Sequence, residues 1–233
     1  MKEFKKLTEE INLNISEEKL EKFFTYKEML KEWNEKINLT AIVEDEEIVL
    51  KHFIDSLMIN KYIERGISII DVGTGAGFPG IPLKIINDDI ILTLMDSLNK
   101  RLIFLDEVCK NIDLKGVNIV HGRAEDCGQD EKYREKYDVA TARAVANMNV
   151  LLEYCLPFVK VGGIFICMKG NNIEEINETE KALEVLGGKI EKAEKVYLPG
   201  TDIERNIIIV RKLKNTPKEY PRKAGIPSKK PIK

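Results

Sequence analysis

The chain has 233 residues, of which 43% are hydrophobic and 33% charged, a composition that fits one globular domain with short extensions and excludes a disordered protein. No apolar run reaches the roughly 18 residues that a membrane-spanning helix needs, and the first six residues are not followed by the apolar segment of a signal peptide. We therefore expect a cytoplasmic protein with no membrane partner. The net charge is only −2, but basic residues gather at the C-terminal end.

Residues 1–65 are predicted to form a helical extension packed on the core. Ser16 is a good N-cap, followed by two glutamates in the first turn. Large apolar side chains then recur at helical spacing, which favours packing over ligand binding; they are Phe23, Tyr26, Leu30, Trp33 and Ile37. Asn38-Leu39-Thr40 ends this helix, and a second helix is expected over residues 44–60.

From Ile67 onwards strands and helices alternate, which predicts an α/β core over residues 66–213 with a mostly parallel sheet and helices on both faces. The pattern places strands near 67–72, 90–95, 117–121, 137–142, 162–168, 189–197 and 205–211. It places helices near 80–87, 98–111, 147–159 and 172–187, and a tight turn at 160–163. The last two strands have no helix between them, so we expect a hairpin with one reversed strand at the edge of the sheet.

The stretch 67–82 is the most informative part of the chain. A short β-branched run ends in an acid and breaks into glycines: Asp71, Gly73, Gly75, Gly77 and then Phe78. Glycines let the backbone approach a ligand and adopt positive φ, so a nucleotide-type site at the end of a first strand is predicted. The third glycine comes one residue too early for the dinucleotide fingerprint, and Phe78 with the following proline fills the place of a pyrophosphate. This favours S-adenosylmethionine, with dinucleotide binding or a merely structural glycine turn as alternatives.

The next strand also ends in an acid. The apolar run 90–95 leads into Asp96, roughly 20 residues after the glycine turn, where a carboxylate can accept hydrogen bonds from both ribose hydroxyls. This geometry serves NAD and S-adenosylmethionine alike. The alternative for Asp96 is an N-cap of a helix beginning at Ser97.

Motifs that are missing from the sequence narrow the range of possible methyl acceptors. Methylating a pyrimidine C5 needs a thiolate, usually within Pro-Cys or Thr-Cys, and neither dipeptide occurs. The Asn/Asp-Pro-Pro-Tyr/Phe motif for exocyclic amines is missing after the fourth strand, where Arg143 stands instead. Guanine N7 remains open, since its lone pair needs positioning rather than a base. Arg143 is the candidate catalytic residue: it could donate to guanine O6, contact the methionine carboxylate of the cofactor, or merely pair with a surface carboxylate.

The C-terminal tail, residues 214–233, is basic and contains four prolines that we expect to keep it extended. Residues 211–233 carry nine lysines and arginines against one acid. A basic tail on an otherwise acidic chain favours a polyanionic partner such as RNA, with a merely solvated tail as the alternative. The four cysteines lack Cys-x-x-Cys spacing and are expected to be buried thiols, and two histidines make a zinc site improbable, so no metal is predicted.

Several segments in the order 38 to 227 resemble the small-subunit ribosomal RNA guanine-N7 methyltransferase G family, also called glucose-inhibited division protein B. The matching segments are 38–41, 52–57, 71–82, 96–97, 100–101, 123–125, 141–145, 169–170 and 220–227. The resemblance implies a class I methyltransferase (Rossmann-like) seven-stranded fold. It also implies methyl transfer from S-adenosylmethionine to N7 of one guanine in a decoding-region hairpin loop of 16S ribosomal RNA.

The resemblance also implies residue roles. Gly73 and Phe78 would line the cofactor, Ala124 and Glu125 would flank its adenine, and Arg143 would complete the pocket. His52 and Asp55 could form a pair on one helical face or serve packing alone. Candidate RNA contacts are Lys100, Arg101, Lys169, Arg222, Lys223, Lys229 and Lys230.

The expected partner is 16S ribosomal RNA or the small ribosomal subunit, and we expect a monomer. Two function classes remain as alternatives. One is an NAD-dependent oxidoreductase, for which His121 is the candidate near a strand end. The other is a non-enzymatic RNA-binding assembly factor.

Overall fold

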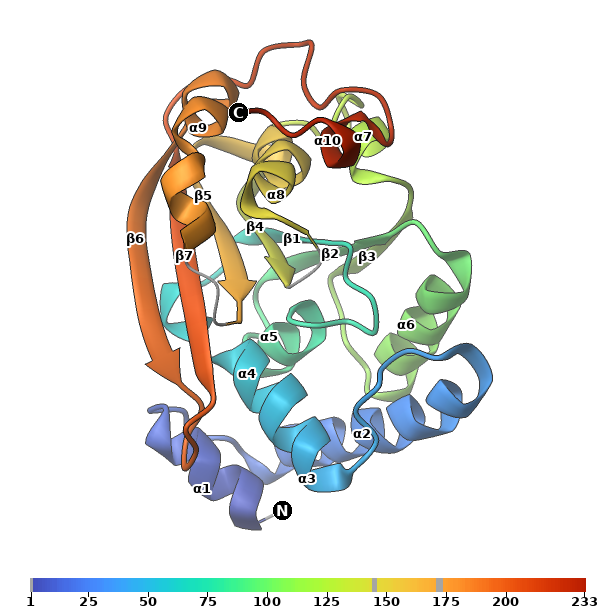
Figure 1. Cartoon of the computed structure of the whole chain (residues 1–233). Helices are drawn as coiled ribbons and strands as arrows, with labels where there is room; N and C mark the ends of the chain where they lie inside the picture. Colours follow the sequence, from blue (N-terminus) through green and yellow to red (C-terminus); the bar gives the residue numbers. More distant parts are fainter. Residues whose placement is uncertain (1, 144–145, 171–173) are drawn as a thin grey trace.

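A computed structural model describes residues 2–143, 146–170 and 174–233. Its centre is one seven-stranded sheet with the order β3-β2-β1-β4-β5-β7-β6 (Figure 1). The strands are β1 (Ser68–Val72), β2 (Ile91–Asp96), β3 (Val117–His121), β4 (Tyr137–Arg143), β5 (Val159–Lys169), β6 (Gly188–Tyr197) and β7 (Glu204–Lys212). Within these ranges no helix is both long and apolar enough to cross a membrane.

Helices cover both faces of the sheet. They are α1 (Lys2–Glu10), α2 (Glu17–Ile37), α3 (Asp45–Ile48), α4 (Asp55–Leu57), α5 (Gly80–Ile86), α6 (Asn99–Asn111), α7 (Ala124–Cys127), α8 (Met148–Cys155), α9 (Glu180–Leu186) and α10 (Ile226–Lys229), with the π-helical η1 (Val49–Ile54) and the 3-10 turns η2 (Asn60–Tyr62), η3 (Leu156–Phe158) and η4 (Glu174–Glu178). Successive strand residues face opposite layers. Ile69 belongs to the buried cluster under α2, α5 and α6, and Ile70 to the cluster under α8 and α9.

The reversed strand lies inside the sheet and not at its edge, contrary to expectation. β7 is antiparallel to both β5 and β6, and β6 takes the outer position. The reason lies in composition. Residues 206–210 of β7 are all buried, as suits a strand covered on both faces, whereas β6 alternates and carries charged side chains toward solvent.

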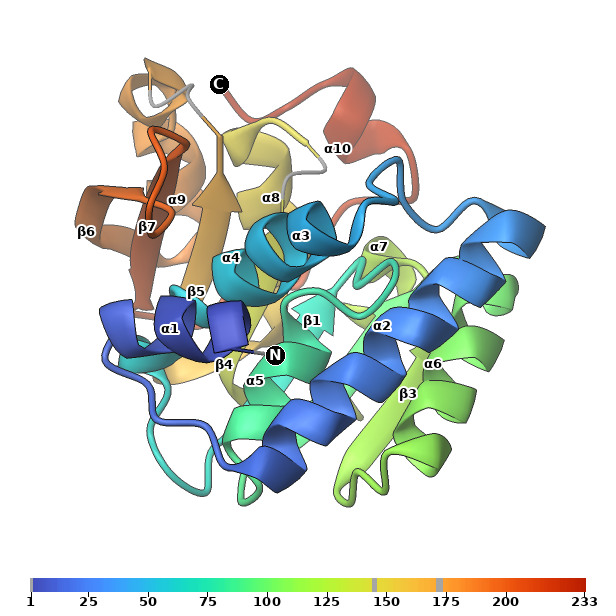
Figure 2. The same ribbon diagram turned by 90° about the horizontal axis from the view of Figure 1, so that it is seen from below.

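The N-terminal extension packs under the glycine loop. Ser16 caps α2 through a 3.3 Å bond from Lys19 N–H to its Oγ, as predicted. Phe23 and Tyr26 are completely buried, and the Tyr26 hydroxyl donates to the carbonyl of Ala76 within the glycine loop. Seen from below, α2 runs beside α5 and α6 (Figure 2).

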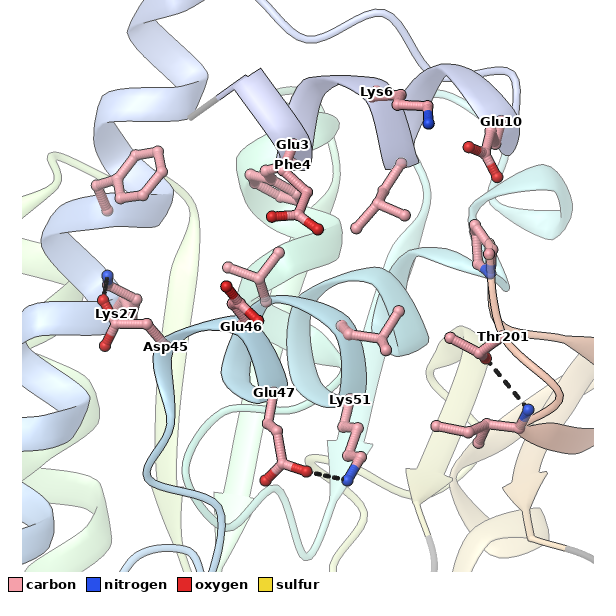
Figure 3. A pocket seen from close by; sticks show the side chains of 17 residues that line it. Glu3, Phe4, Lys6, Glu10, Lys27, Asp45, Glu46, Glu47, Lys51 and Thr201 are labelled. Carbon is pink, nitrogen blue, oxygen red and sulfur yellow. Dashed lines mark hydrogen bonds and ion pairs between the residues drawn. The ribbon is translucent and has the colours of Figure 1, made fainter.

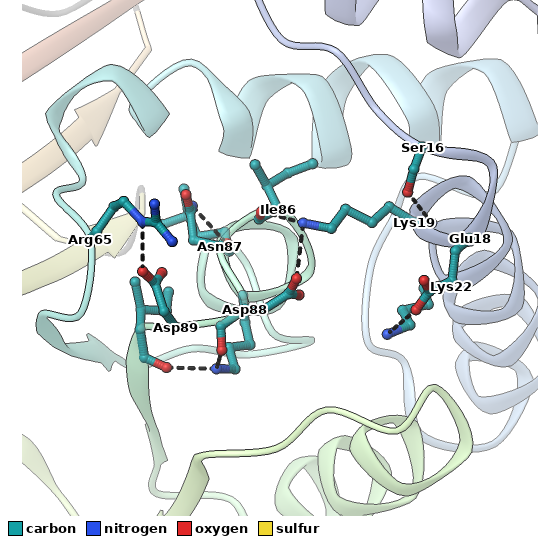
Figure 4. Close-up of polar contacts among 12 residues, drawn as sticks. Ser16, Glu18, Lys19, Lys22, Arg65, Ile86, Asn87, Asp88 and Asp89 are labelled. Atoms are coloured by element: carbon teal, nitrogen blue, oxygen red, sulfur yellow. Dashed lines mark hydrogen bonds and ion pairs between the residues drawn. The ribbon is translucent and has the colours of Figure 1, made fainter.

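Polar contacts tie the same extension to the turn between α5 and β2, at the opposite edge of the sheet (Figure 4). Lys19 Nζ donates to the Ile86 carbonyl at 2.6 Å and pairs with Asp88 at 3.2 Å. Arg65, just before β1, pairs with Asp89 at 3.0 Å. The extension is therefore anchored at both edges of the first strands.

Three predicted boundaries differ from the structure. The helix expected over 44–60 contains a π-helical segment in which Asp55 N–H bonds to the Leu50 carbonyl, five residues back. The turn expected at 160–163 lies within β5, where Gly162 at φ 88° stands beside a register shift against β4. Of the helix expected over 172–187, α9 begins only at Glu180 after the short η4, and residues 171–173 lie outside the described ranges.

The tail is not extended throughout, contrary to the expectation from its prolines. It crosses α7 and α8 and includes the short helix α10 (Figure 1). The reason is a remote side chain that binds its backbone. Arg134 donates to the carbonyls of Gly128 and Tyr220, both at 2.7 Å, of Thr216 at 2.6 Å and of Pro217 at 3.1 Å.

Candidate active site at the carboxyl edge of the sheet

The three glycines of the loop after β1 all have positive φ, at 68°, 62° and 99°, as predicted. Their surroundings differ. A Cβ on Gly73 would meet nothing within 4 Å, and on Gly75 only a backbone oxygen at 4.0 Å. A Cβ on Gly77 would lie 2.7 Å from Ile81 and 2.8 Å from the Tyr26 hydroxyl. Gly73 therefore leaves the backbone open to a ligand, whereas Gly77 lets the N-terminal extension approach.

Asp71 holds the loop in place from below. Its side chain is completely buried, and Oδ2 accepts from the Thr74 hydroxyl at 2.7 Å and from Gly80 N–H at 3.0 Å. Burial raises the pKa of Asp71 to about 6, against the opposing effect of these two hydrogen bonds. Oδ1 accepts no hydrogen bond from the described residues. Asp71 thus shapes the loop and does not line the neighbouring cavity.

A cavity of about 400 Å³ opens beside this loop, within the size range of small-molecule sites. It brings together four of the predicted cofactor residues, Gly73, Asp96, Ala124 and Glu125, from three strand ends. Arg101 of α6, Tyr154 of α8 and Gly225 of the tail also line it. The contribution of the tail was not predicted, because nothing in its local sequence indicates that it folds back.

Asp96 connects the second strand to the glycine loop. Only 3% exposed, it accepts from Gly75 N–H at 3.0 Å, from Leu98 N–H at 2.8 Å and from Arg101 at 3.2 Å. α6 begins at Asn99 and not at Ser97, so Asp96 lies before the N-cap position. Arg101, predicted to contact RNA, forms an ion pair with this carboxylate.

Arg143 ends β4, the strand next to β1. Asp71 of β1 is the register partner of Thr141 of β4. Gly73 and Arg143, each two residues further along the chain, therefore lie at the same level. Nη2 donates to His52 Nδ1 at 3.0 Å, and Nη1 donates to the Lys51 carbonyl at 3.2 Å. The guanidinium also lies 4.9 Å from the centre of the Phe78 ring. Arg143 and Phe78 form a second cluster beside the cavity instead of lining it; residues 144–145 of this segment lie outside the described ranges.

His52 and Asp55 both contact Arg143. They were expected either to pair with each other or to serve packing alone, and the structure shows a third arrangement in which both bind the same guanidinium. The His52 ring stacks on Phe78 at 4.5 Å and 13°. Burial, and then the charge of Arg143, lower the pKa of His52 to about 3, so the ring is neutral near pH 7. Since Nδ1 accepts from Arg143, Nε2 carries the proton and donates to Thr40 Oγ1 at 2.8 Å.

Asp55 completes this cluster from the other side. It lies 3.5 Å from Arg143 Nη1 and accepts from Arg205 Nε at 3.0 Å. Arg205 was missed by sequence reasoning: because β7 is antiparallel, its first residues lie at the edge where the parallel strands end. Thr40 lies in the family-matching segment 38–41, but no role was predicted for its side chain, which contacts His52.

The predicted RNA contacts fall into two groups. Lys100, Lys223, Lys229 and Lys230 are exposed. By contrast, Lys169 is mostly buried against Glu175, and Arg222 is bound by the completely buried Glu153. Among the basic residues of the tail region, Lys212 is also buried and bonds to the Leu156 carbonyl at 2.6 Å.

A larger cavity, of about 650 Å³, lies elsewhere, between α1, α3–η1 and the β6–β7 turn (Figure 3). Four of the charged side chains that line it form two ion pairs: Lys27 with Asp45, and Lys51 with Glu47. Among the described residues, its lining shares none with the cavity beside the glycine loop.

Comparisons with known proteins agree on one family. The model of the family "GidB: rRNA small subunit methyltransferase G" matches residues 19–208. Ribosomal RNA small subunit methyltransferase G of Acetivibrio thermocellus is 58% identical over 221 residues, covering 94% of this chain and 91% of the relative. The protein of the same name in Alkaliphilus metalliredigens is 55% identical, covering 97% and 95%.

Solved structures agree on the fold at low identity. A SAM-dependent methyltransferase from Aquifex aeolicus superposes with a TM-score of 0.52 at 17% identity, over 72% of this chain and 93% of that chain. M. jannaschii TYW2 in complex with AdoMet gives 0.52 at 16% identity, over 67% and 74%. The oxidoreductase and the non-enzymatic assembly factor find no support in these comparisons. The chain belongs to the rRNA small subunit methyltransferase G family.

Proposed function

We propose that the protein transfers a methyl group from S-adenosylmethionine to N7 of one guanine in a decoding-region hairpin loop of 16S ribosomal RNA. The observation that carries this proposal is the adjacency of two features at one sheet edge. One is the cavity with Gly73, Asp96 and Glu125, and the other is the Arg143 cluster at the neighbouring strand end. Membership of the family supports the ribosomal substrate.

The residues present fit the cofactor. Gly73 leaves open space where a side chain would stand. Asp96 would accept hydrogen bonds from the ribose hydroxyls, and Glu125 would accept one from the exocyclic amine of adenine. When bound, S-adenosylmethionine supplies a methyl group on a positively charged sulfur. Binding at Asp96 requires the carboxylate to exchange or share its bonds to Leu98 and Arg101.

The acceptor side needs orientation more than acid–base chemistry. Guanine N7 has a lone pair and no proton, so holding the reacting atoms in line can lower the barrier by roughly 7–11 kcal/mol without a general base. We propose that Arg143 donates to guanine O6 and leaves N7 free. The neutral His52 and the carboxylate of Asp55 fix the direction of its guanidinium.

Exposed lysines of α6 and of the tail would contact phosphates, which position RNA without reading its sequence. Lys100, Lys223, Lys229 and Lys230 are the residues we propose for this role, with Lys169 bordering the site. Arg101 and Arg222 are less available because Asp96 and Glu153 bind them. We further propose a cytoplasmic monomer that acts on 16S ribosomal RNA or on the small subunit.

The test is direct. The purified protein is incubated with radiolabelled S-adenosylmethionine and small ribosomal subunits that lack their native methylations, and the RNA is digested to nucleosides. Label in 7-methylguanosine from 16S RNA is expected. Label in another nucleoside would contradict the acceptor. Absence of label together with absence of cofactor binding would contradict the assignment of the cavity.

A further inference from the structure

The C-terminal tail reaches into the cavity that we assign to the cofactor. Gly225 lines this cavity, and its backbone N–H donates to Oε1 of Glu125 at 3.0 Å. Glu125 is the second residue of the short helix α7 and is 8% exposed. One oxygen of the carboxylate that would face adenine is therefore fixed by a residue 100 positions later in the chain.

Arg222 holds this part of the tail in place. Its backbone N–H and Nε donate to Oε1 of Glu153 at 2.8 and 2.9 Å, and Nη2 donates to Oε2 at 2.6 Å. Glu153 is completely buried within α8, the helix whose Leu151 and Tyr154 line the same cavity. A buried carboxylate must be paired to be tolerated, so this contact defines where the tail crosses α8.

A second set of contacts fixes the tail just before Arg222. Gln129, two residues after the end of α7, donates from Nε2 to the Lys218 carbonyl at 3.0 Å and to the Pro221 carbonyl at 2.8 Å. Arg134 binds the Tyr220 carbonyl at 2.7 Å. The tail is thus fastened to both α7 and α8, the two helices that form the Glu125 side of the cavity.

We infer that residues 220–228 form the adenine-side wall of the cofactor site, and that Arg222 is a positioning residue that acts through Gly225 to orient Glu125 toward the exocyclic amine of adenine. This inference rests on the proposed function. It also changes the role of Arg222: the guanidinium that the sequence suggested for RNA phosphate is used to build the small-molecule site.

The test uses two ligands in the absence of RNA: S-adenosylhomocysteine, and S-inosylhomocysteine, in which a carbonyl replaces the amine. Affinities are measured by isothermal titration calorimetry for the wild type, Arg222→Gln and Lys218→Gln. Lys218 is an exposed tail residue, so its variant removes the same charge from the same segment. The readout is the ratio of the two affinities, which partial unfolding does not change, because it lowers both by the same factor.

The wild type is expected to prefer the adenosine compound. Arg222→Gln should reduce that preference about tenfold, the effect of losing one well-oriented hydrogen bond to a charged group, and Lys218→Gln should leave it unchanged. Arg222→Lys keeps the charge but not the two-pronged contact, so it should resemble Arg222→Gln.

The opposite results separate the two proposals. No binding of S-adenosylhomocysteine by the wild type would overturn the proposed function and this inference with it. Wild-type binding with a preference that Arg222→Gln retains would overturn the inference alone. A wild type that binds both compounds equally would also overturn it, because Glu125 would then not read the amine.

Discussion

The two ends of the chain approach the carboxyl edge of the sheet from opposite layers, and different forces hold them there. The N-terminal extension is packed by apolar side chains, among them the completely buried Phe23 and Tyr26, and it delivers His52 and Asp55 to Arg143. The C-terminal tail is held mainly by polar contacts, from Arg134 and to Glu153, and it delivers Gly225 to Glu125.

This difference has a consequence for the site. Apolar packing is non-directional and tolerates similar side chains, whereas a charge-assisted hydrogen bond depends on one donor and one acceptor. The N-terminal extension, which supports Arg143 on the acceptor side, should therefore fail through loss of folding. The cofactor side should fail through single polar substitutions that leave most of the fold intact.

The largest expected effect comes from removing a buried apolar side chain of the N-terminal extension. Phe23→Ala removes a completely buried ring that contacts Phe4 edge-on at 4.9 Å and Phe53 at 5.0 Å. It should lower the free energy of unfolding by about 3–5 kcal/mol, measured by chemical denaturation. Glu21→Ala, exposed on the same helix, should change it by less than about 0.5 kcal/mol. Equal effects of the two substitutions would contradict the packing role.

Arg143→Gln tests the residue that the N-terminal end orients. We expect the rate of RNA methylation at saturating cofactor to fall about 100-fold or more, the usual result of removing a donor aimed at the reacting group. The matched control is Arg65→Gln, which removes an exposed arginine at the other edge of the sheet and should leave the rate unchanged. A fall in cofactor affinity with an unchanged maximal rate would instead place Arg143 on the cofactor.

Asp96→Asn tests the point where the two sides meet. The change keeps the shape of the side chain but removes the charge that binds Gly75 N–H and Arg101. Loss of a charged hydrogen-bond partner should weaken S-adenosylhomocysteine binding about 10- to 100-fold, measured by calorimetry. Asp106→Asn on the exposed face of α6 should have no effect. Wild-type affinity in Asp96→Asn would remove Asp96 from the site.

Substituting Lys223, Lys229 and Lys230 together by glutamine asks whether the tail has a second role. These side chains are exposed, unlike Arg222. If each meets a phosphate, the slope of log affinity for RNA against log salt should shrink by about two, while S-adenosylhomocysteine binding stays unchanged. An unchanged slope would restrict the tail to building the cofactor wall.

Local pattern was sufficient to predict the strands, the glycine loop and the placing of Asp96, because each depends on neighbours within a few residues. It was not sufficient for the tail. Arg134 and Glu153 are separated in the sequence by 69 or more residues from the tail residues with which they form hydrogen bonds. Nothing in the sequence around Arg134 or Glu153 distinguishes them from surface charges. Gly77 shows the same limit: its position in the motif was clear, but its contact with Tyr26 depends on a separate helix.

The smallest expected effect is the contribution of His52, in the N-terminal extension, to the pH dependence of the unfolding free energy. The pKa of His52 falls from 6.5 to about 3 on folding. Below pH 6.5 His52 therefore binds a proton in the unfolded chain but stays unprotonated in the folded chain. The free energy of unfolding then decreases as the pH falls toward 3, by up to about 1.4 kcal/mol per pH unit. His52→Asn should lack this component, so the difference in unfolding free energy between wild type and variant should change between pH 7.5 and 5.5.

Because His52 stays neutral throughout that range in the folded protein, its ionisation should add no inflection near pH 6.5 to the methylation rate. A constant stability difference with such an inflection would mean that His52 titrates in the folded protein.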